Sequence, residues 1–125
     1  MKKNVAIIGA SANREKFGNK AARAFRLAGY EVYPVNPHEN TIEGLKVYPK
    51  ISDIPEKIDI VSMYVKPEIG LTIAPEIIEK GVKEVYINPG AGNEALVGYL
   101  EERDVVVHQE CSIRALGMNI AQFTA

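Results

Sequence analysis

The sequence has a single cysteine, no long apolar run and almost no net charge. Cys111 cannot form an internal disulfide, which is compatible with a reducing compartment and also with a free thiol. No apolar stretch approaches the roughly 18–20 residues that span a bilayer, and the opening MKKNVAIIGAS runs into a strand-like segment without a cleavable signal pattern. We therefore expect a cytoplasmic protein that does not bind membranes.

The near-neutral charge disfavours a nucleic-acid-binding protein. The net charge is −1, from 15 basic and 16 acidic side chains, whereas nucleic-acid-binding domains usually carry a basic surplus. In the first thirty residues, however, Glu15 is the one acid against Lys2, Lys3, Arg14, Lys16, Lys20, Arg23 and Arg26. This asymmetry favours a local anionic ligand, although for Arg23 and Arg26 a solvated helix face is an equal alternative.

Length and residue pattern predict one α/β domain over residues 1–125. Hydrophobic residues make up 46% of the chain, enough for a single core. Short runs rich in Val, Ile and Tyr alternate with helix-like segments, and their continuous apolar character suits strands buried on both faces of a parallel sheet. The five predicted strands are Val5–Ile8, Glu31–Val35, Ile58–Val65, Glu84–Ile87 and Val105–His108. The sequence thus predicts a doubly wound, mainly parallel five-stranded sheet with helices on both faces.

The helices between these strands carry recognisable start and stop signals. Lys20–Ala28 has a small apolar face, Asn19 as a candidate N-cap and Gly29 as a stop. A second helix is expected from Pro67 to Gly81, with Pro75 kinking it or dividing it into two short helices. Asn93 is expected to cap Glu94–Glu102, and the tail from Ser112 to form a last short helix.

In doubly wound sheets, ligands bind beyond the carboxyl ends of the strands. The loop after the first strand, GASANREKFGN, offers Gly9 for close backbone approach, Ser11 and Asn13 as polar groups, and Arg14 and Lys16 as cations. Unpaired amides at the following helix N-terminus favour phosphate. The alternative is that this loop only forms a turn between the strand and the helix and binds no ligand, but an anion site is the better interpretation.

The glycine spacing disfavours a nicotinamide dinucleotide. The G-x-G-x-x-G fingerprint would place glycine where the chain has Ser11 and Arg14. The second strand ends in YPVNPHE, so the acid that holds an NAD ribose is replaced by Val35-Asn36-Pro37, and Glu39 comes late.

Two further strand ends contribute to the same predicted rim. The third strand leaves through MYVKPE, where Tyr64 and Val65 offer an apolar wall beside Lys66. The fourth leaves through NPGAGNE, where Gly90 and Gly92 offer exposed amides. The alternative for each loop is that its glycine and proline residues only form a turn and bind no ligand. Together the loops predict a groove that takes phosphates at one end and an adenine or pantetheine-like arm along the rest.

The ordered set GASANREKFGN, VNP, VKP, NPGAG and ECS resembles the small stand-alone CoA-binding domain proteins, which are similar to the N-terminal domain of the succinyl-CoA synthetase α subunit. The resemblance covers nearly the whole chain and implies a Rossmann-like domain that binds coenzyme A (CoA) or an acyl-CoA. It implies a phosphate turn of Gly9, Ala10, Ser11 and Asn13, completed by Lys16 and Asn19. The remaining residues that we expect at the ligand are Arg14, Val35, Asn36, Pro37, His38, Tyr64, Val65, Lys66, Pro67, Asn88, Pro89 and Gly90.

The chain departs from that family in ways that limit the chemistry. The phosphorylated histidine of the ligase lies in a second domain, and neither His38 nor His108 matches it by position. His38 is a candidate phosphate contact, whereas His108 is expected to be structural. Cys111 is followed by Ser112 and not by the proline of the family's Cys-Pro pattern, so a buried structural thiol is favoured over a nucleophile.

We therefore predict a CoA or acyl-CoA binding protein acting as a carrier or sensor, with no catalytic residue and no metal ligand. The alternatives are an NAD(P)-binding redox enzyme or sensor, and a CoA-binding subunit of a split acyl-CoA ligase. The expected partner is the ligand itself, with a homo-oligomer or a ligase-like subunit as alternatives.

Overall fold

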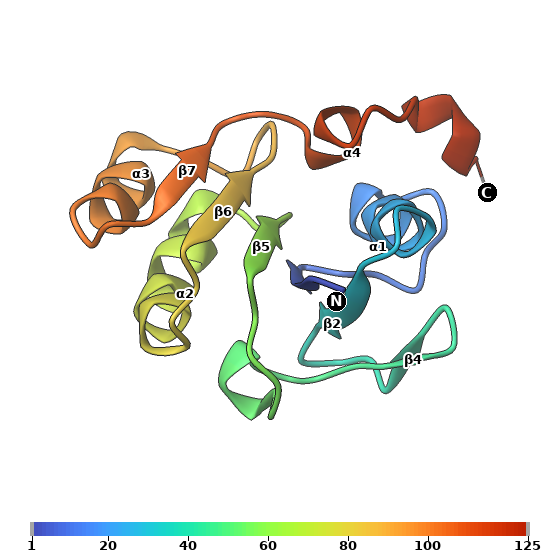
Figure 1. The fold of residues 1–125 in the computed structure, drawn as a ribbon, viewed down its shortest axis with the longest axis horizontal. Helices are drawn as coiled ribbons and strands as arrows, with labels where there is room; N and C mark the ends of the chain where they lie inside the picture. The colour runs from blue at the N-terminus through green and yellow to red at the C-terminus, as the bar shows by residue number, and fades with distance from the viewer. Residues whose placement is uncertain (1, 125) are drawn as a thin grey trace.

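The computed structural model describes residues 2–124, and its centre is a five-stranded parallel sheet (Figure 1). The strand order is β2-β1-β5-β6-β7. The strands are β1 (Asn4–Ile8), β2 (Glu31–Val35), β5 (Ile60–Met63), β6 (Glu84–Ile87) and β7 (Val106–His108). The doubly wound α/β prediction is confirmed. The third predicted strand, Ile58–Val65, was too long, and the predicted domain ends, residues 1 and 125, lie outside the described residues.

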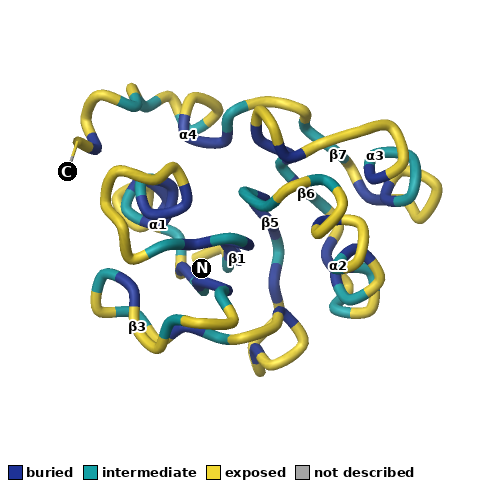
Figure 2. Tube along the Cα trace, turned by 180° about the vertical axis from the view of Figure 1, so that it is seen from behind, coloured by how far each residue is buried: buried dark blue, intermediate teal, exposed yellow. Residues whose placement is uncertain are grey.

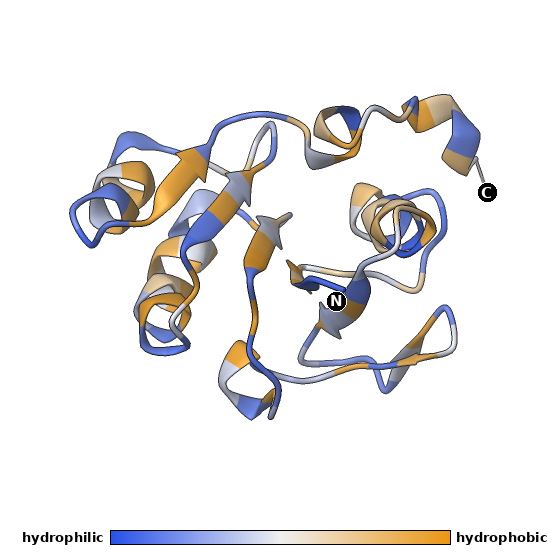
Figure 3. Ribbon diagram, viewed as in Figure 1, coloured by the Kyte–Doolittle hydropathy of each residue, from blue (hydrophilic) through white to orange (hydrophobic). Residues whose placement is uncertain are grey.

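Helices cover both faces of the sheet and divide the core into two layers. One layer holds α1 (Phe17–Leu27), α4 (Ser112–Ala115) and the 3-10 helix η2 (Ile120–Phe123). The other holds α2 (Pro67–Glu79), α3 (Glu94–Glu101) and the 3-10 helix η1 (Ile51–Asp53). Figure 2 shows the buried residues along the central strands and on the inner sides of the helices, and Figure 3 shows apolar residues along β5 and β7.

Helix α1 begins at Phe17, three residues before the predicted start, so Asn19 is not its cap. Lys16 occupies the N-cap position and makes no side-chain capping bond. Asn19 is fully buried within the helix, and its amide group donates to the Ser11 carbonyl and to Glu43 Oε2. The amide side chain that suggested a cap therefore ties the first turn of α1 to two other segments.

The remaining helix boundaries follow the predicted signals. Helix α2 starts at Pro67 and runs through Pro75 without a break, so the expectation of two short helices was wrong. Pro75 and Leu71, whose carbonyl loses its helical partner to the proline, are both exposed residues of α2. Asn93 caps α3 as predicted, since its side chain accepts from the Leu96 amide. None of the helices within residues 2–124 combines the length and apolar character that crossing a bilayer requires.

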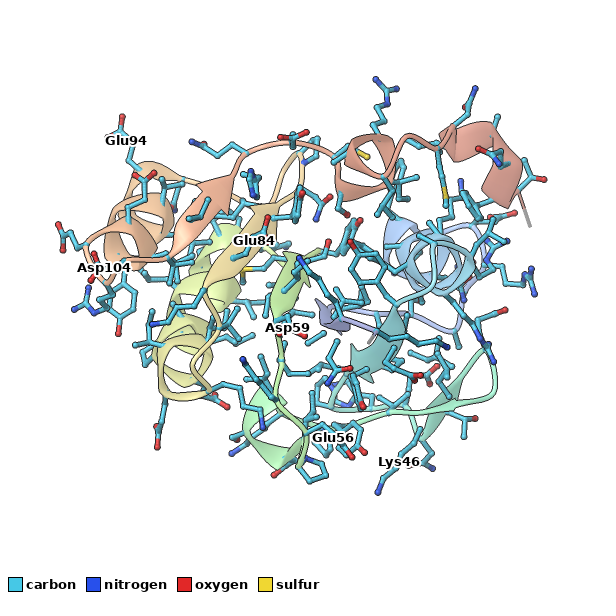
Figure 4. The ribbon with its side chains drawn as sticks, viewed as in Figure 1. Lys46, Glu56, Asp59, Glu84, Glu94 and Asp104 are labelled. Carbon is cyan, nitrogen blue, oxygen red and sulfur yellow. The ribbon has the colours of Figure 1, made fainter. Side chains whose placement is uncertain are left out.

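A small hairpin follows β2 and was not predicted. Strands β3 (Thr41–Ile42) and β4 (Leu45–Lys46) are joined by Glu43 and Gly44, both with positive φ (51° and 76°). This is the conformation of a two-residue hairpin turn, which Asn-Gly or Asp-Gly usually forms. Figure 4 labels Lys46 on this hairpin. The Glu43 carboxylate accepts from Arg14 and Asn19, and its carbonyl accepts from Arg26, so the hairpin is fastened to α1.

Candidate functional site

A groove of about 590 Å³ opens at the carboxyl ends of β1, β5 and β6. From β1 the chain crosses through α1 to β2, and from β5 it crosses through α2 to β6 on the other side, so the strand order diverges between β1 and β5. This is where doubly wound sheets bind ligands. The groove is lined by Gly9, Ala10, Ser11, Glu15, Lys16, Phe17, Gly18, Asn36, Tyr64, Val65, Lys66, Pro89, Gly90 and Ala91.

The wall formed by the β1–α1 loop depends on two glycines. Gly9 has φ +85°, and an added Cβ would lie 3.0 Å from the carbonyl carbon and oxygen of Tyr64. A Cβ on Gly18 would lie 2.3 Å from the Gly9 carbonyl oxygen. The first turn of α1 therefore packs directly on the end of β1. The amides of Phe17 and Gly18, at the start of that helix, have no intrahelical partner and are available to an acceptor in the groove.

Two lysines from different strand-end loops give the groove its positive charge. Lys16 and Lys66 both line it, both are exposed, and neither forms an ion pair within residues 2–124. Glu15 is the one acid in the lining. Arg14, which was expected beside Lys16, pairs with Glu43 instead, with Nη1 3.1 Å from Oε1. The local charge therefore favours an anion, with Lys16 and Lys66 as its cationic contacts.

Arg23 links α1 to the β1–α1 loop and to the C-terminal segment. Its Nε donates to Asn19 Oδ1 at 2.8 Å, and its other nitrogens donate to the carbonyls of Arg14, Phe123 and Thr124. Arg23 is absent from the groove lining and is partly exposed, so it is not a ligand contact of the groove. Its role is to hold three segments of the chain together.

The loop after β2 reaches the groove through one side chain, Asn36. Its amide nitrogen donates to the Ala10 carbonyl at 2.8 Å, and its Oδ1 accepts from the His38 amide at 2.7 Å. Asn36 thus connects the loops that follow β1 and β2. Val35, Pro37 and His38 are not part of the lining, and the His38 side chain is exposed.

Beneath the groove, a buried network of polar side chains joins the ends of β5 and β6 to α4. Asn88 Nδ2 donates to Ser62 Oγ and to the Met63 carbonyl, both at 2.9 Å, while Asn88 Oδ1 accepts from the Ser112 amide at 2.8 Å. Ser112 Oγ lies 2.8 Å from both Ser62 Oγ and the Tyr64 hydroxyl. Burial raises the pKa of the Tyr64 phenol, which keeps its proton at neutral pH.

Replacing Ser112 by alanine tests the contribution of this network to stability. Ser62 is fully buried, and the substitution removes its hydroxyl partner. We expect the free energy of unfolding to fall by about 1–3 kcal/mol, measured by urea denaturation. Ser52→Ala, at an exposed serine of η1, is the control and is expected to change stability by less than about 0.5 kcal/mol. Equal midpoints for the two variants would contradict a stabilising role for the network.

Next to the groove lies a second cavity, of about 300 Å³, which the sequence did not predict. Its lining residues are Phe17, Tyr64, Asn88, Pro89, Cys111, Arg114 and Ile120. Cys111 is half-buried and free, so the expected buried thiol is only partly buried. His108 does not reach either space, since its Nε2 is 2.7 Å from Glu84 Oε2 and its ring stacks on Tyr86. Figure 4 labels Glu84, which lies on β6.

The groove brings together ten of the predicted ligand residues and leaves eight outside its lining. Those inside are Gly9, Ala10, Ser11, Lys16, Asn36, Tyr64, Val65, Lys66, Pro89 and Gly90. Those outside are Asn13, Arg14, Asn19, Val35, Pro37, His38, Pro67 and Asn88, of which Asn88 lines the second cavity. Asn13 shapes the loop, because its Oδ1 accepts from the Glu15 amide.

Sequence reasoning missed Glu15, Phe17, Gly18 and Ala91 in the groove lining. The first three belong to GASANREKFGN, the loop already assigned to the anion site, so assigning the whole loop to the site would have included them. Ala91 belongs to NPGAG, the loop already assigned to the rim.

The chain is similar to known proteins over most of its length. A family model described as a CoA binding domain matches residues 3–116. The chain is 35% identical over 121 residues to the ADP-forming acetate–CoA ligase II of Archaeoglobus fulgidus, covering 94% of this chain and 18% of the ligase. It is 32% identical over 120 residues to the α subunit of the ADP-forming acetate–CoA ligase II of Pyrococcus furiosus, covering 94% of this chain and 26% of that subunit. A solved structure of a conserved hypothetical protein from Pyrococcus furiosus has a TM-score of 0.84 and 35% identity, covering 92% of this chain and 99% of the other.

Proposed function

Since this chain belongs to the CoA-binding domain family, we propose that it binds CoA or an acyl-CoA in the groove between β1, β5 and β6, as a carrier or sensor that performs no ligase step by itself. The main support for this proposal is the position of Lys16, Ser11 and the first amides of α1. They lie at the end of β1, where the strand order diverges, and Lys66 lines the same groove. These groups provide positive charge and donors where a phosphorylated ligand of this fold class binds.

The residues present fit the chemistry of CoA. Its pyrophosphate is suited to Ser11, Lys16 and the unpaired amides of Phe17 and Gly18, because these are cationic or donating groups. The loop after β2 supplies Asn36 in place of an acid, and an acid there would repel the 3′-phosphate of the CoA ribose. The uncharged pantetheine arm is suited to the wall formed by Tyr64, Val65 and Pro89.

A second candidate is a CoA-binding subunit of a ligase assembled from separate chains. The ligase relative of Archaeoglobus fulgidus and the α subunit of Pyrococcus furiosus are several times longer, since this chain spans 18% and 26% of their lengths. In this candidate function, the chain serves as the CoA-binding portion of such an enzyme. Co-purification with a nucleotide-binding chain, together with ligase activity only in the mixture, would favour this candidate over an independent carrier.

Thermal unfolding with CoA, acetyl-CoA, NAD and NADP tests the proposal. A ligand at a hundred times its Kd stabilises the folded state by about 2.7 kcal/mol, which shifts the Tm by several degrees for a domain of this size. We expect this shift with CoA or acetyl-CoA and none with NAD or NADP. A natively folded protein, verified by circular dichroism, that responds to neither CoA compound would refute CoA binding. A larger shift with NAD or NADP would favour the redox alternative.

A further inference from the structure

Tyr64 lies where the groove meets the second cavity. The two spaces share Phe17, Tyr64 and Pro89 in their linings, so they are neighbours along one wall. Apart from the Arg114 guanidinium, the second cavity is lined mainly by apolar groups, among them the side chains of Phe17 and Ile120. A ligand whose phosphates lie near Lys16 can thus extend its far end past Tyr64 into this cavity.

The hydrogen-bond partners in the buried network determine which atom of each pair donates. The assignment starts at the Asn88 side chain. The Ser112 amide can only donate, so the Asn88 atom 2.8 Å away is its carbonyl oxygen. The Met63 carbonyl can only accept, so the Asn88 atom 2.9 Å away is its amide nitrogen. The two backbone groups agree on one orientation of the Asn88 side chain, and its second amide proton goes to Ser62 Oγ.

The direction of the two serine hydroxyls follows from Asn88. Ser62 Oγ accepts from Asn88, and its other partner within the described chain is Ser112 Oγ at 2.8 Å. Ser62 is fully buried, so its proton must go to Ser112, because an unpaired donor there would cost about 1–3 kcal/mol. Ser112 then donates its own proton to the Tyr64 oxygen, also at 2.8 Å.

The chain of donors therefore ends on a tyrosine that accepts from Ser112 and retains its own proton. Ser112 Oγ is the hydrogen-bond partner of the Tyr64 hydroxyl within residues 2–124, and in this order of donors it leaves the Tyr64 proton without an acceptor there. Accepting from Ser112 polarises the phenol and makes it a stronger donor. Burial raises the pKa of Tyr64, so the proton is retained across the neutral range. The cavity wall thus presents one oriented neutral donor.

We infer that the second cavity receives the short acyl group of an acyl-CoA, with the thioester carbonyl oxygen accepting a hydrogen bond from the Tyr64 hydroxyl. This inference rests on the proposed CoA binding in the adjoining groove. A thioester carbonyl provides the acceptor that the directed network lacks, and free CoA, which ends in a thiol, provides only a weak one. The site therefore distinguishes acylated from free CoA, which a sensor of acyl-CoA status requires.

Calorimetric titration with acetyl-CoA and CoA tests this inference in the wild type and in Tyr64→Phe. We expect the wild type to bind acetyl-CoA about three- to tenfold more tightly than CoA, the range of one neutral hydrogen bond. Tyr64→Phe keeps the ring and removes only the hydroxyl, so it is expected to bring the ratio of the two affinities close to one. Tyr99→Phe, at a half-buried tyrosine of α3 away from both spaces, is the matched control and should keep the wild-type ratio.

Infrared spectroscopy of bound acetyl-CoA with a ¹³C-labelled carbonyl measures the hydrogen bond directly. The carbonyl frequency would not change if the Tyr64 hydroxyl had only a structural role. A hydrogen bond lowers the carbonyl stretching frequency, so the wild type should show a shift to lower frequency that Tyr64→Phe lacks. Equal affinities of the wild type for the two ligands, or an identical carbonyl frequency in both proteins, would overturn the acyl site while leaving CoA binding intact. Failure of both ligands to bind the folded wild type would overturn the CoA proposal and the acyl site with it.

Discussion

Gly18→Ala is expected to destabilise the protein by about 3 kcal/mol and to abolish most of its affinity for CoA. The added Cβ would lie 2.3 Å from the Gly9 carbonyl oxygen, a distance at which the backbone itself must move. Overpacking of this kind typically costs 1–3 kcal/mol, and here the contact is with main chain, which cannot rotate away. Moving the first turn of α1 also displaces the amides proposed to hold phosphate. Urea denaturation and calorimetric titration with CoA measure the two effects.

Gly98→Ala is the matched control for this experiment. Gly98 lies within α3, and nothing is within 4 Å of the position its Cβ would occupy. Because alanine favours a helix over glycine, this variant should be more stable than the wild type by about 0.5–1 kcal/mol and should bind CoA normally. A Gly18→Ala protein with wild-type stability and affinity would show that α1 does not need its close contact with the end of β1.

Replacing both Lys16 and Lys66 by alanine is expected to weaken CoA binding about a hundredfold with little change in stability. Both side chains are exposed and outside any ion pair in the described part of the chain, so their loss removes no described ion-pair partner. A charge-assisted hydrogen bond contributes about 1.5–3 kcal/mol, which is at least tenfold in affinity for each lysine. The effects should add if the lysines contact different phosphates.

Salt and a remote lysine complete the test of the charge contribution. Raising ionic strength should weaken CoA binding in the wild type and have less effect in the double variant, because fewer charges remain to be screened. Lys83→Ala is the control, since Lys83 is exposed and directly precedes β6, at the opposite end of that strand from the groove. Unchanged affinity in the Lys16 and Lys66 double variant would locate the phosphates elsewhere on the protein.

The regular elements could be predicted from the sequence because their signals are local. The predicted limits of β2 and β6 agree with the structure, since each is a short run of β-branched and aromatic residues between turns. Gly29 and Gly81 follow α1 and α2 with φ of 93° and 81°, as expected of glycines that end helices. The hairpin of β3 and β4 was missed because strands of two residues leave too little pattern to detect.

Polar side chains were predicted less well, because their partners lie far away in the sequence. Asn19 had the local signature of a cap, yet Glu43, 24 positions away, and Ser11 take its amide protons. Arg14 had the local signature of a phosphate contact, yet it pairs with Glu43, 29 positions away. Local spacing predicts what a side chain is able to bind, whereas the fold determines which partner is within reach.

Local patterns in the sequence were sufficient to predict the alternation of strands and helices, and with it the strand-end loops in which a phosphate site was expected. Hydrophobic periodicity and glycine or proline stops are properties of neighbouring residues, so they can be recognised without a structure. The folded structure was needed to show that Lys16 and Lys66 line one groove while Arg14 does not. It alone placed Ser62, Asn88 and Ser112 in one buried network behind Tyr64, because residues 24 to 50 positions apart meet only when the sheet and α4 pack together.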